Sequence, residues 1–237
     1  MTRKMTEAVP SGREVIERVT TSTGEWQLQR RDGHFEIICN GVFLMASYNQ
    51  QSDRELAHLA LQRVHGNELR VLVGGLGIGF TAQAALEDPR VARVDIVEIE
   101  PMVVRWHRDY FAPLVGQPLN DPRTRLIEAD LSNVPLSPGT FDALLLDTDN
   151  GPGWLAREEN SRFYEIVGAT NFFRSLRTGG VLAFWSGERV PNFARVLREI
   201  ASEVEEIEVP EMIAPALRGT AWIYLVTRKG EANGKPR

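Results

Sequence analysis

The chain has 237 residues, of which 43% are hydrophobic and 25% charged, and its formal net charge is −5. These values are typical of one soluble α/β domain with a small appendage, and the negative balance argues against a general nucleic-acid binder. The single cysteine, Cys39, excludes an internal disulfide, and neither a signal peptide nor a membrane span of roughly 20 apolar residues is visible, so we expect a cytoplasmic protein.

The N-terminal part carries a hairpin pattern. Residues 1–14 are polar and aperiodic, which predicts a flexible tail. Between residues 15 and 52 the pattern changes to short alternating runs separated by turn residues, which predicts a small antiparallel sheet. Its expected strands cover 26–30, 34–39 and 42–45. A helix over 53–64 follows, for which Ser52 is the expected N-cap.

From residue 70 on, hydrophobic strand runs alternate with helical patterns. We expect strands at 70–74, 93–98, 124–129, 141–146, 180–185, 204–209 and 220–227. The intervening helices are expected at 79–87, 101–112, 159–176 and 191–203. This alternation predicts a mostly parallel, doubly wound sheet that ends in an antiparallel edge hairpin. The predicted class is α/β, with a Rossmann-like domain over 53–228 and a second flexible tail over 229–237.

The most informative segment is the glycine-rich turn after the strand at 70–74. It contains Gly74, Gly75, Gly77 and Gly79, and Glu98 ends the following strand. Glycines allow a tight turn close to a ligand, and an acid at the next strand tip can bind both ribose hydroxyls. The pattern therefore predicts an adenosine-type ligand. A tight turn without a ligand and a solvated strand end are the alternatives.

Two more strands end in acids. Asp130 can accept a hydrogen bond from an exocyclic amine such as that of adenine, or it can cap the segment that begins at Leu131. Asp147, Asp149 and Asn150 follow an apolar strand and predict an anionic mouth for a cationic ligand or a proton acceptor. An Asx-rich turn held by its own backbone is the alternative. We expect no metal, since no zinc or iron ligand spacing is present.

Taken in this order, the motifs resemble the spermidine/spermine synthase (polyamine aminopropyltransferase) family, a branch of the class I methyltransferase-like fold. The resemblance covers most of the chain, from about Phe35 to Thr227. The matching segments are 71–75, 97–101, 121–123, 127–130, 141–147, 163–164 and 177–182. The family also carries a small N-terminal sheet, which agrees with the predicted appendage.

The resemblance implies a co-substrate and roles for individual residues. The co-substrate would be S-adenosylmethionine or its decarboxylated form, lying over the glycine turn. Glu98 would hold the ribose hydroxyls and Asp130 the adenine amine, while Asp147 would orient or deprotonate the attacking amine. The predicted cofactor-binding set is Gly74, Gly75, Gly77, Gly79, Glu98, Ile99, Asp130, Leu131 and Asp147, and the predicted catalytic set is Asp147, Asp149 and Asn150.

The chain departs from the family at one position that bears on the donor. The family has an aspartate where this chain has Gly77, and that acid pairs with the aminopropyl ammonium of decarboxylated S-adenosylmethionine. A turn without it tolerates a donor that keeps its carboxylate. We therefore hypothesise that the chain uses S-adenosylmethionine and transfers a methyl or related alkyl group to a small, amine-bearing acceptor.

Three alternatives stay open. True aminopropyl transfer to a polyamine is the nearest. A nicotinamide-dependent oxidoreductase is suggested by the G-x-G-x-x-A pattern over 77–82, and the last alternative is an inactive scaffold of the same fold. The resemblance also implies a homodimer or larger homo-oligomer, and we expect neither a nucleic-acid nor a membrane partner.

Overall fold

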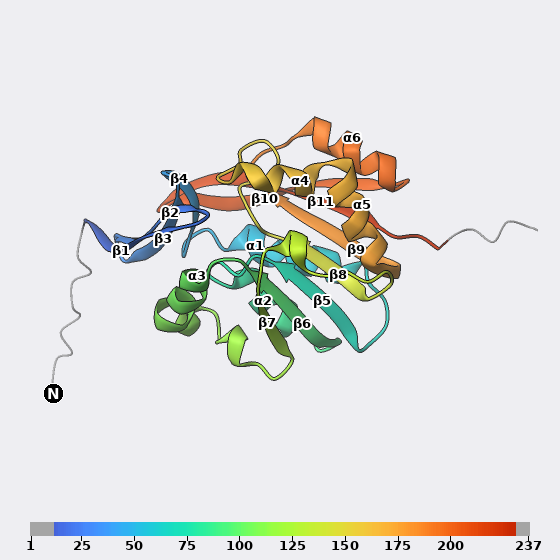
Figure 1. Ribbon diagram of the computed structural model, residues 1–237, viewed down its shortest axis with the longest axis horizontal. Coiled ribbons are helices and arrows are strands. Elements are labelled where there is room, and N and C mark those ends of the chain that lie inside the picture. Colours follow the sequence, from blue (N-terminus) through green and yellow to red (C-terminus); the bar gives the residue numbers. More distant parts are fainter. Residues whose placement is uncertain (1–11, 231–237) are drawn as a thin grey trace, which may run out of the picture.

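The computed structural model describes residues 12–230, which form two β-sheets (Figure 1). The predicted tails therefore lie mostly outside the described residues. The N-terminal one was predicted too long, because Arg13 and Glu14 already pair with Arg31 and Arg30 in a strand. Within residues 12–230, no helix is long and apolar enough to cross a membrane.

The small sheet is antiparallel, as predicted, with the strand order β1-β2-β3-β4. Its strands are β1 (Arg13–Thr21), β2 (Gly24–Arg31), β3 (His34–Cys39) and β4 (Val42–Ala46). The strand β1 has no predicted counterpart. It lies at the edge of the sheet and contains no buried residue, so its sequence lacks the apolar alternation that reveals a half-buried strand.

The large sheet has seven strands in the order β10-β11-β9-β8-β5-β6-β7. The strands are β5 (Leu69–Gly74), β6 (Val91–Glu98), β7 (Thr124–Glu128), β8 (Phe141–Leu146), β9 (Leu176–Ser186), β10 (Val204–Ala214) and β11 (Leu217–Thr227). The strands β5 to β9 are parallel, while β11 is antiparallel to both β9 and β10. The predicted α/β class with an antiparallel edge hairpin is confirmed.

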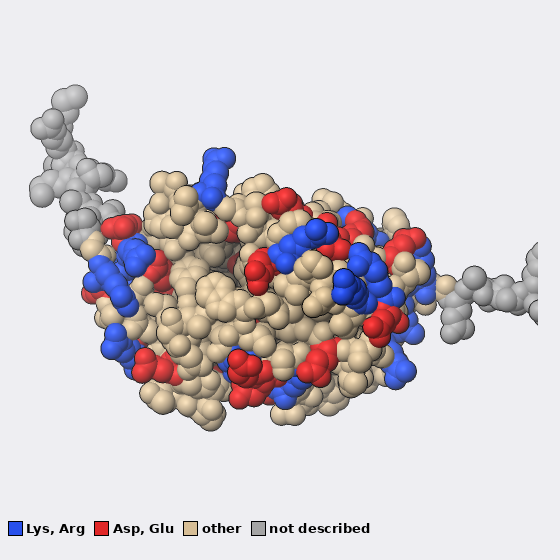
Figure 2. Space-filling model, turned by 90° about the horizontal axis from the view of Figure 1, so that it is seen from above, with Lys and Arg blue, Asp and Glu red and all other residues tan. Residues whose placement is uncertain are grey.

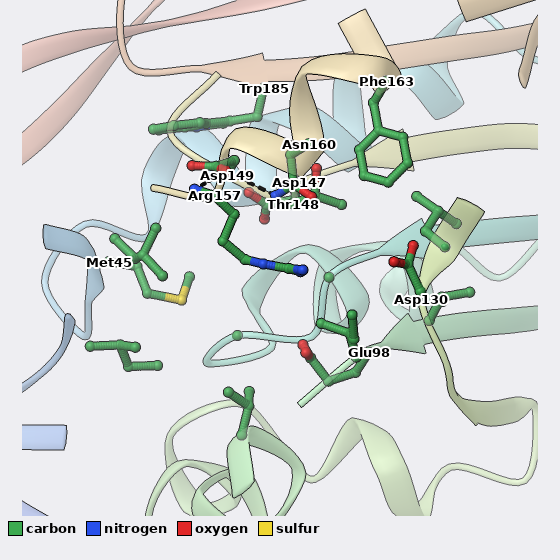
Figure 3. Close-up of a pocket in the computed structure, with 18 of the residues that line it drawn as sticks. Met45, Glu98, Asp130, Asp147, Thr148, Asp149, Arg157, Asn160, Phe163 and Trp185 are labelled. Atoms are coloured by element: carbon green, nitrogen blue, oxygen red, sulfur yellow. Dashed lines mark hydrogen bonds between the residues drawn. The ribbon is translucent and has the colours of Figure 1, made fainter. Parts of the chain in front are cut away.

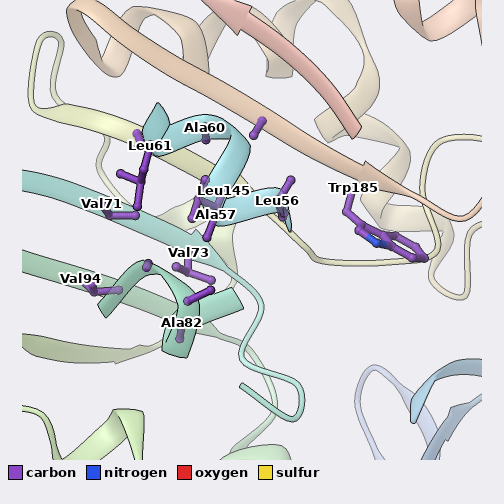
Figure 4. Packing of buried hydrophobic residues seen from close by; sticks show 14 of the residues in the cluster. Leu56, Ala57, Ala60, Leu61, Val71, Val73, Ala82, Val94, Leu145 and Trp185 are labelled. Atoms are coloured by element: carbon purple, nitrogen blue, oxygen red, sulfur yellow. The ribbon is translucent and has the colours of Figure 1, made fainter. Parts of the chain in front are cut away.

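Helices cover both faces of this sheet (Figure 1). They are α1 (Gln51–Gln62), α2 (Phe80–Glu87), α3 (Pro101–Trp106), α4 (Ser161–Tyr164), α5 (Ile166–Ser175) and α6 (Pro191–Ile200). On one face, Leu56 and Ala57 of α1 belong to one buried cluster with Val71 and Val73 of β5 (Figure 4). On the other face, Leu72 is buried in a second cluster with residues of α4, α5 and α6. Alternate side chains of β5 therefore pack on opposite faces, as a strand covered on both sides requires.

A third buried cluster joins the small sheet to the large domain. Leu28 and Ile37 of the small sheet lie in one cluster with Ile78, which follows β5, and with Trp106 at the end of α3. Ile78 and Trp106 flank the glycine turn and the strand tip that carries Glu98. The small sheet is therefore held close to the carboxyl ends of β5 and β6, where ligands of parallel α/β sheets bind.

Two helix predictions need correction. Ser52 does not cap a helix: α1 begins at Gln51 with Gln50 as its N-cap, and Ser52 lies inside the helix, where its hydroxyl donates to Glu211. The helix expected over 159–176 is broken at Glu165, whose backbone is extended (ψ 159°), so that α4 and α5 are separate. At this break the backbone carbonyl of Arg162 lies very close to Gly168. A Cβ at position 168 would overlap that carbonyl.

Candidate active site

A pocket lies at the carboxyl ends of β5, β6, β7 and β8, facing the small sheet (Figure 3). Its empty space, counted together with the open solvent at its mouth, is about 890 Å³. Most of the predicted site residues line it: Gly75, Gly77, Glu98, Ile99, Asp130, Leu131, Asp147 and Asp149. Gly74, Gly79 and Asn150 do not.

The glycine turn brings the backbone close to two neighbours, Asp147 and Met45. Gly75 has a φ of +94° and lies so near the carbonyl oxygen of Asp147 that a Cβ would overlap it. Gly77 has a φ of +51°, and a Cβ there would overlap the sulfur of Met45, which reaches over from β4. A side chain at position 77 is therefore excluded twice, by backbone conformation and by Met45. A thioether fills the space in which the family's aspartate would begin.

Glu98 is held rigidly at the tip of β6. Its Oε2 accepts a hydrogen bond from the backbone N–H of Leu76 (2.9 Å), and its Oε1 accepts one from Glu100 (2.8 Å). Burial raises the pKa of Glu98, and these backbone hydrogen bonds oppose the rise. Each carboxylate oxygen has a further lone pair, so Glu98 can accept two more hydrogen bonds from a vicinal diol in the pocket.

Asp130 caps the segment that follows it and also lines the pocket. Its Oδ1 accepts hydrogen bonds from the backbone N–H of Ser132 (2.9 Å) and from the Ser132 hydroxyl (2.8 Å), so it caps the short helical turn that follows. Its Oδ2 pairs with Arg162 at 2.7 Å. Burial alone would raise the pKa of Asp130, but the contacts with Ser132 and Arg162 lower it below its ordinary value. The side chain is thus an anion on the pocket wall.

Asp147 is a half-buried carboxyl that directly follows β8. The Thr81 hydroxyl donates to its Oδ2 at 2.7 Å. Burial raises the pKa of Asp147 to about 6, although the Thr81 hydrogen bond opposes this shift. The group therefore changes its charge near neutral pH, the range in which a proton acceptor is most useful.

A buried acid, Asp53, lines the same pocket and was missed by the sequence analysis. Its side chain comes from the first turn of α1, only 5% of the residue is exposed, and its Oδ2 has no hydrogen-bond partner among the described residues. Burial raises its pKa well above the ordinary value, and the charges of Asp147 and Glu211 raise it further. The sequence could have pointed to Asp53, because it is an acid on the apolar face of its helix, three residues before Leu56 and four before Ala57.

Asp149 and Asn150 organise the loop that follows β8. Asp149 accepts hydrogen bonds from the backbone N–H groups of Asn150, Ala156 and Arg157 and from the side chain of Asn160, at 2.7–3.2 Å. The Asn150 side chain donates to the carbonyl of Phe43 in β4 at 2.8 Å. This agrees with the Asx-turn alternative for these two residues. These contacts order the loop and tie it to the small sheet, while the catalytic role of Asp149 and Asn150 stays a prediction.

The far wall of the pocket is aromatic and polar. Trp185, at the end of β9, donates through its indole N–H to the Ser52 hydroxyl (2.8 Å), and Ser52 in turn donates to Glu211 (2.7 Å). The loop after β8 adds Arg157, whose side chain points into the pocket in Figure 3. Trp154, which belongs to the same loop, is 53% exposed and does not line the pocket.

Comparison with known proteins shows which family this sequence is similar to. Residues 50–233 match the model of the spermine/spermidine synthase domain. Putrescine N-methyltransferase 1 of Nicotiana tabacum is 29% identical over 178 residues, which is 74% of this chain and 44% of that protein. Spermidine synthase 2 of Datura stramonium is 30% identical over 176 residues, 72% of this chain and 52% of that protein. The chain thus spans about half the length of the curated relatives it matches.

Solved structures agree on the fold. A spermidine synthase in complex with the transition state analogue AdoDATO has a TM-score of 0.76 at 16% sequence identity, covering 90% of this chain and 73% of that one. The spermidine synthase of Thermotoga maritima has the same TM-score at 15% identity, with 90% and 72% coverage. At these identities the similarity concerns the fold alone.

Proposed function

The chain belongs to the spermine/spermidine synthase domain family, and from that premise we propose that it transfers a methyl group from S-adenosylmethionine to a small amine. The observation that carries this proposal is the division of one pocket into two halves. Glu98 and Asp130 offer acceptors for the ribose and the adenine amine, while Asp53 and Asp147 supply carboxyl groups for a cationic amine. A partly buried ammonium needs such partners.

The proposed reaction is an in-line displacement. The acceptor nitrogen forms a bond to the donor carbon, the bond from that carbon to the sulfonium breaks, and its electron pair stays on sulfur as a neutral thioether. The nitrogen loses one proton, which the carboxylate of Asp147 would accept. No covalent enzyme intermediate is needed, so the contribution of the protein is positioning and electrostatic stabilisation.

Aminopropyl transfer from decarboxylated S-adenosylmethionine is the second candidate, favoured by the two acids Asp53 and Asp147, which could hold two cationic groups. Against it stands Met45, which fills the space beside Gly77 with an uncharged thioether. Relatives of both kinds, a putrescine N-methyltransferase and a spermidine synthase, have almost the same identity to this chain. Identity therefore does not decide between the two groups, and the chemistry of the pocket favours methyl transfer.

Product analysis tests the proposal. With putrescine as acceptor and S-adenosylmethionine as donor, we expect S-adenosylhomocysteine and an N-methylated amine, detected by mass spectrometry. Formation of 5′-methylthioadenosine with the decarboxylated donor only would establish aminopropyl transfer instead. A chain that binds neither donor, as judged by calorimetry, would contradict both.

The rate of this reaction is expected to rise with pH through about 6. Burial raises the pKa of Asp147 to about 6, and only the ionised carboxylate can accept a proton. Below that pH the protonated form accumulates, so kcat should fall about tenfold per pH unit. The check is kcat at saturating donor and acceptor between about pH 5 and pH 8. A flat profile over this range would show that Asp147 is not the proton acceptor.

A further inference from the structure

The pocket contains a cationic side chain, that of Arg157, which has no role in the proposed reaction. Among its lining residues that the structure describes, Arg157 alone is basic. In Figure 3 its side chain enters the pocket and ends in the space between Asp147 and Thr148 on one side and Glu98 on the other. Both reactants of an aminopropyl transfer to a diamine carry positive charge. A guanidinium in the same pocket would repel both of them.

The backbone of Arg157 is held by a hydrogen bond, whereas its guanidinium has no hydrogen-bond partner among the described residues. The backbone N–H of Arg157 donates to Oδ2 of Asp149 at 3.2 Å, which holds the residue at the pocket wall. Its Nε is buried without a hydrogen-bond partner, and no carboxylate among residues 12–230 pairs with it. The Nε of the nearby Arg162 is also buried without a partner, but its Nη2 pairs with Asp130 at 2.7 Å, whereas no group of the Arg157 guanidinium has such a pairing among residues 12–230. A partly buried, unpaired guanidinium is costly, and a ligand anion would remove that cost.

We propose that Arg157 binds a ligand carboxylate, so that the pocket recognises the zwitterionic head of an α-amino acid. The planar guanidinium matches a carboxylate with two parallel hydrogen bonds, and Asp53, whose buried Oδ2 has no hydrogen-bond partner among the described residues, supplies a carboxyl group of the same pocket for the ammonium. This inference rests on the proposed function. It deepens it by naming a specificity-determining residue and the chemical class that it selects.

The face of the molecule shown in Figure 2 carries no comparable cationic site. There, acidic and basic side chains are interspersed. The carboxylate can come from either of two sources, the methionine part of the donor or an amino-acid acceptor. In both cases the chemistry at Arg157 is the same, and the experiment separates them.

The donor arm compares three ligands by calorimetry: S-adenosylhomocysteine, its decarboxylated analogue, and 5′-methylthioadenosine, which lacks the amino-acid tail. If the donor supplies the carboxylate, the wild-type protein should bind S-adenosylhomocysteine about 10–100-fold more tightly than the decarboxylated analogue. Arg157→Gln should abolish this preference and leave the affinity for 5′-methylthioadenosine unchanged. Arg157→Lys should retain part of the preference, because it keeps the positive charge but cannot form the two parallel hydrogen bonds of a guanidinium.

The acceptor arm is run with 5′-methylthioadenosine bound, which leaves the space near Arg157 free. It compares ornithine with putrescine, two diamines that differ by a carboxylate. A preference for ornithine that Arg157→Gln abolishes would support the inference and assign the carboxylate to the acceptor. The matched control is Arg195→Gln, which removes an arginine of α6 whose side chain donates to Asn192 outside the pocket.

The inference is overturned if neither arm shows a preference for the carboxylate, or if Arg157→Gln leaves the preference intact. That outcome differs from failure of the proposed function. If the wild-type protein binds 5′-methylthioadenosine but ignores the carboxylate, only the role of Arg157 is wrong. If it binds none of the adenosine ligands, the proposed function is wrong as well. Equal thermal midpoints of the variants would show that each is folded.

Discussion

Replacing Asp147 by asparagine is expected to lower kcat by about 10²–10⁴-fold, the largest effect of any single substitution in this pocket. Asparagine has nearly the same size, and its amide oxygen can still accept the hydrogen bond from Thr81 that the structure shows at 2.7 Å. It cannot take up a proton, and it does not supply the negative charge that stabilises an ammonium. The loss should therefore appear in the chemical step, with binding of 5′-methylthioadenosine changed by no more than about threefold.

The measurement is product formation with putrescine and S-adenosylmethionine under saturating conditions. Asp142→Asn is the matched control, because Asp142 lies near the start of the same strand, where it accepts from the backbone of Arg70 and pairs with Arg177. It makes the same chemical change at the opposite end of β8. An Asp147→Asn variant with the rate of the wild-type protein would exclude Asp147 as the proton acceptor.

Glu98→Gln is expected to weaken binding of 5′-methylthioadenosine by about 10²-fold, because hydrogen bonds to a charged group contribute about 1.5–3 kcal/mol each. Both oxygens of Glu98 already accept from backbone N–H groups, those of Leu76 and Glu100. An amide can offer only one acceptor oxygen. Its NH₂ group would face one of these N–H donors, so the substitution disturbs the turn as well as the contact with the ribose.

Calorimetry with 5′-methylthioadenosine measures this loss, and the chain provides a close control. Glu128 is the partner of Glu98 in the register of β6 and β7, but it is exposed and does not line the pocket. Glu128→Gln should leave the affinity unchanged. Equal weakening by both substitutions would mean that a general change of charge, rather than a contact with the ribose, is responsible.

The order of the elements could be predicted because it depends on local patterns. Apolar runs and helical periodicity are properties of neighbouring residues, and so are the glycine turn after β5 and the acids at the strand tips. The predictions failed where tertiary contacts override such patterns. Ser52 has a typical capping side chain, yet it is buried inside α1 and donates to Glu211, which lies 159 positions further along the chain. The edge strand β1 has apolar residues, Val15, Ile16 and Val19, but none is fully buried and they do not alternate with polar ones, so the pattern of a strand is absent.

The α/β class, the glycine turn and the strand-tip acids Glu98, Asp130 and Asp147 can be read from the amino-acid sequence, because a parallel sheet brings all its carboxyl ends to one edge. Which polar groups remain free for a ligand depends on the packing of distant segments. This packing engages Asp149 with the loop after β8, fills the space beside Gly77 with Met45, and leaves Asp53 and Arg157 without protein partners at their buried atoms. Burial and hydrogen-bond partners come from segments far apart in the chain, and these contacts set the charge of the pocket.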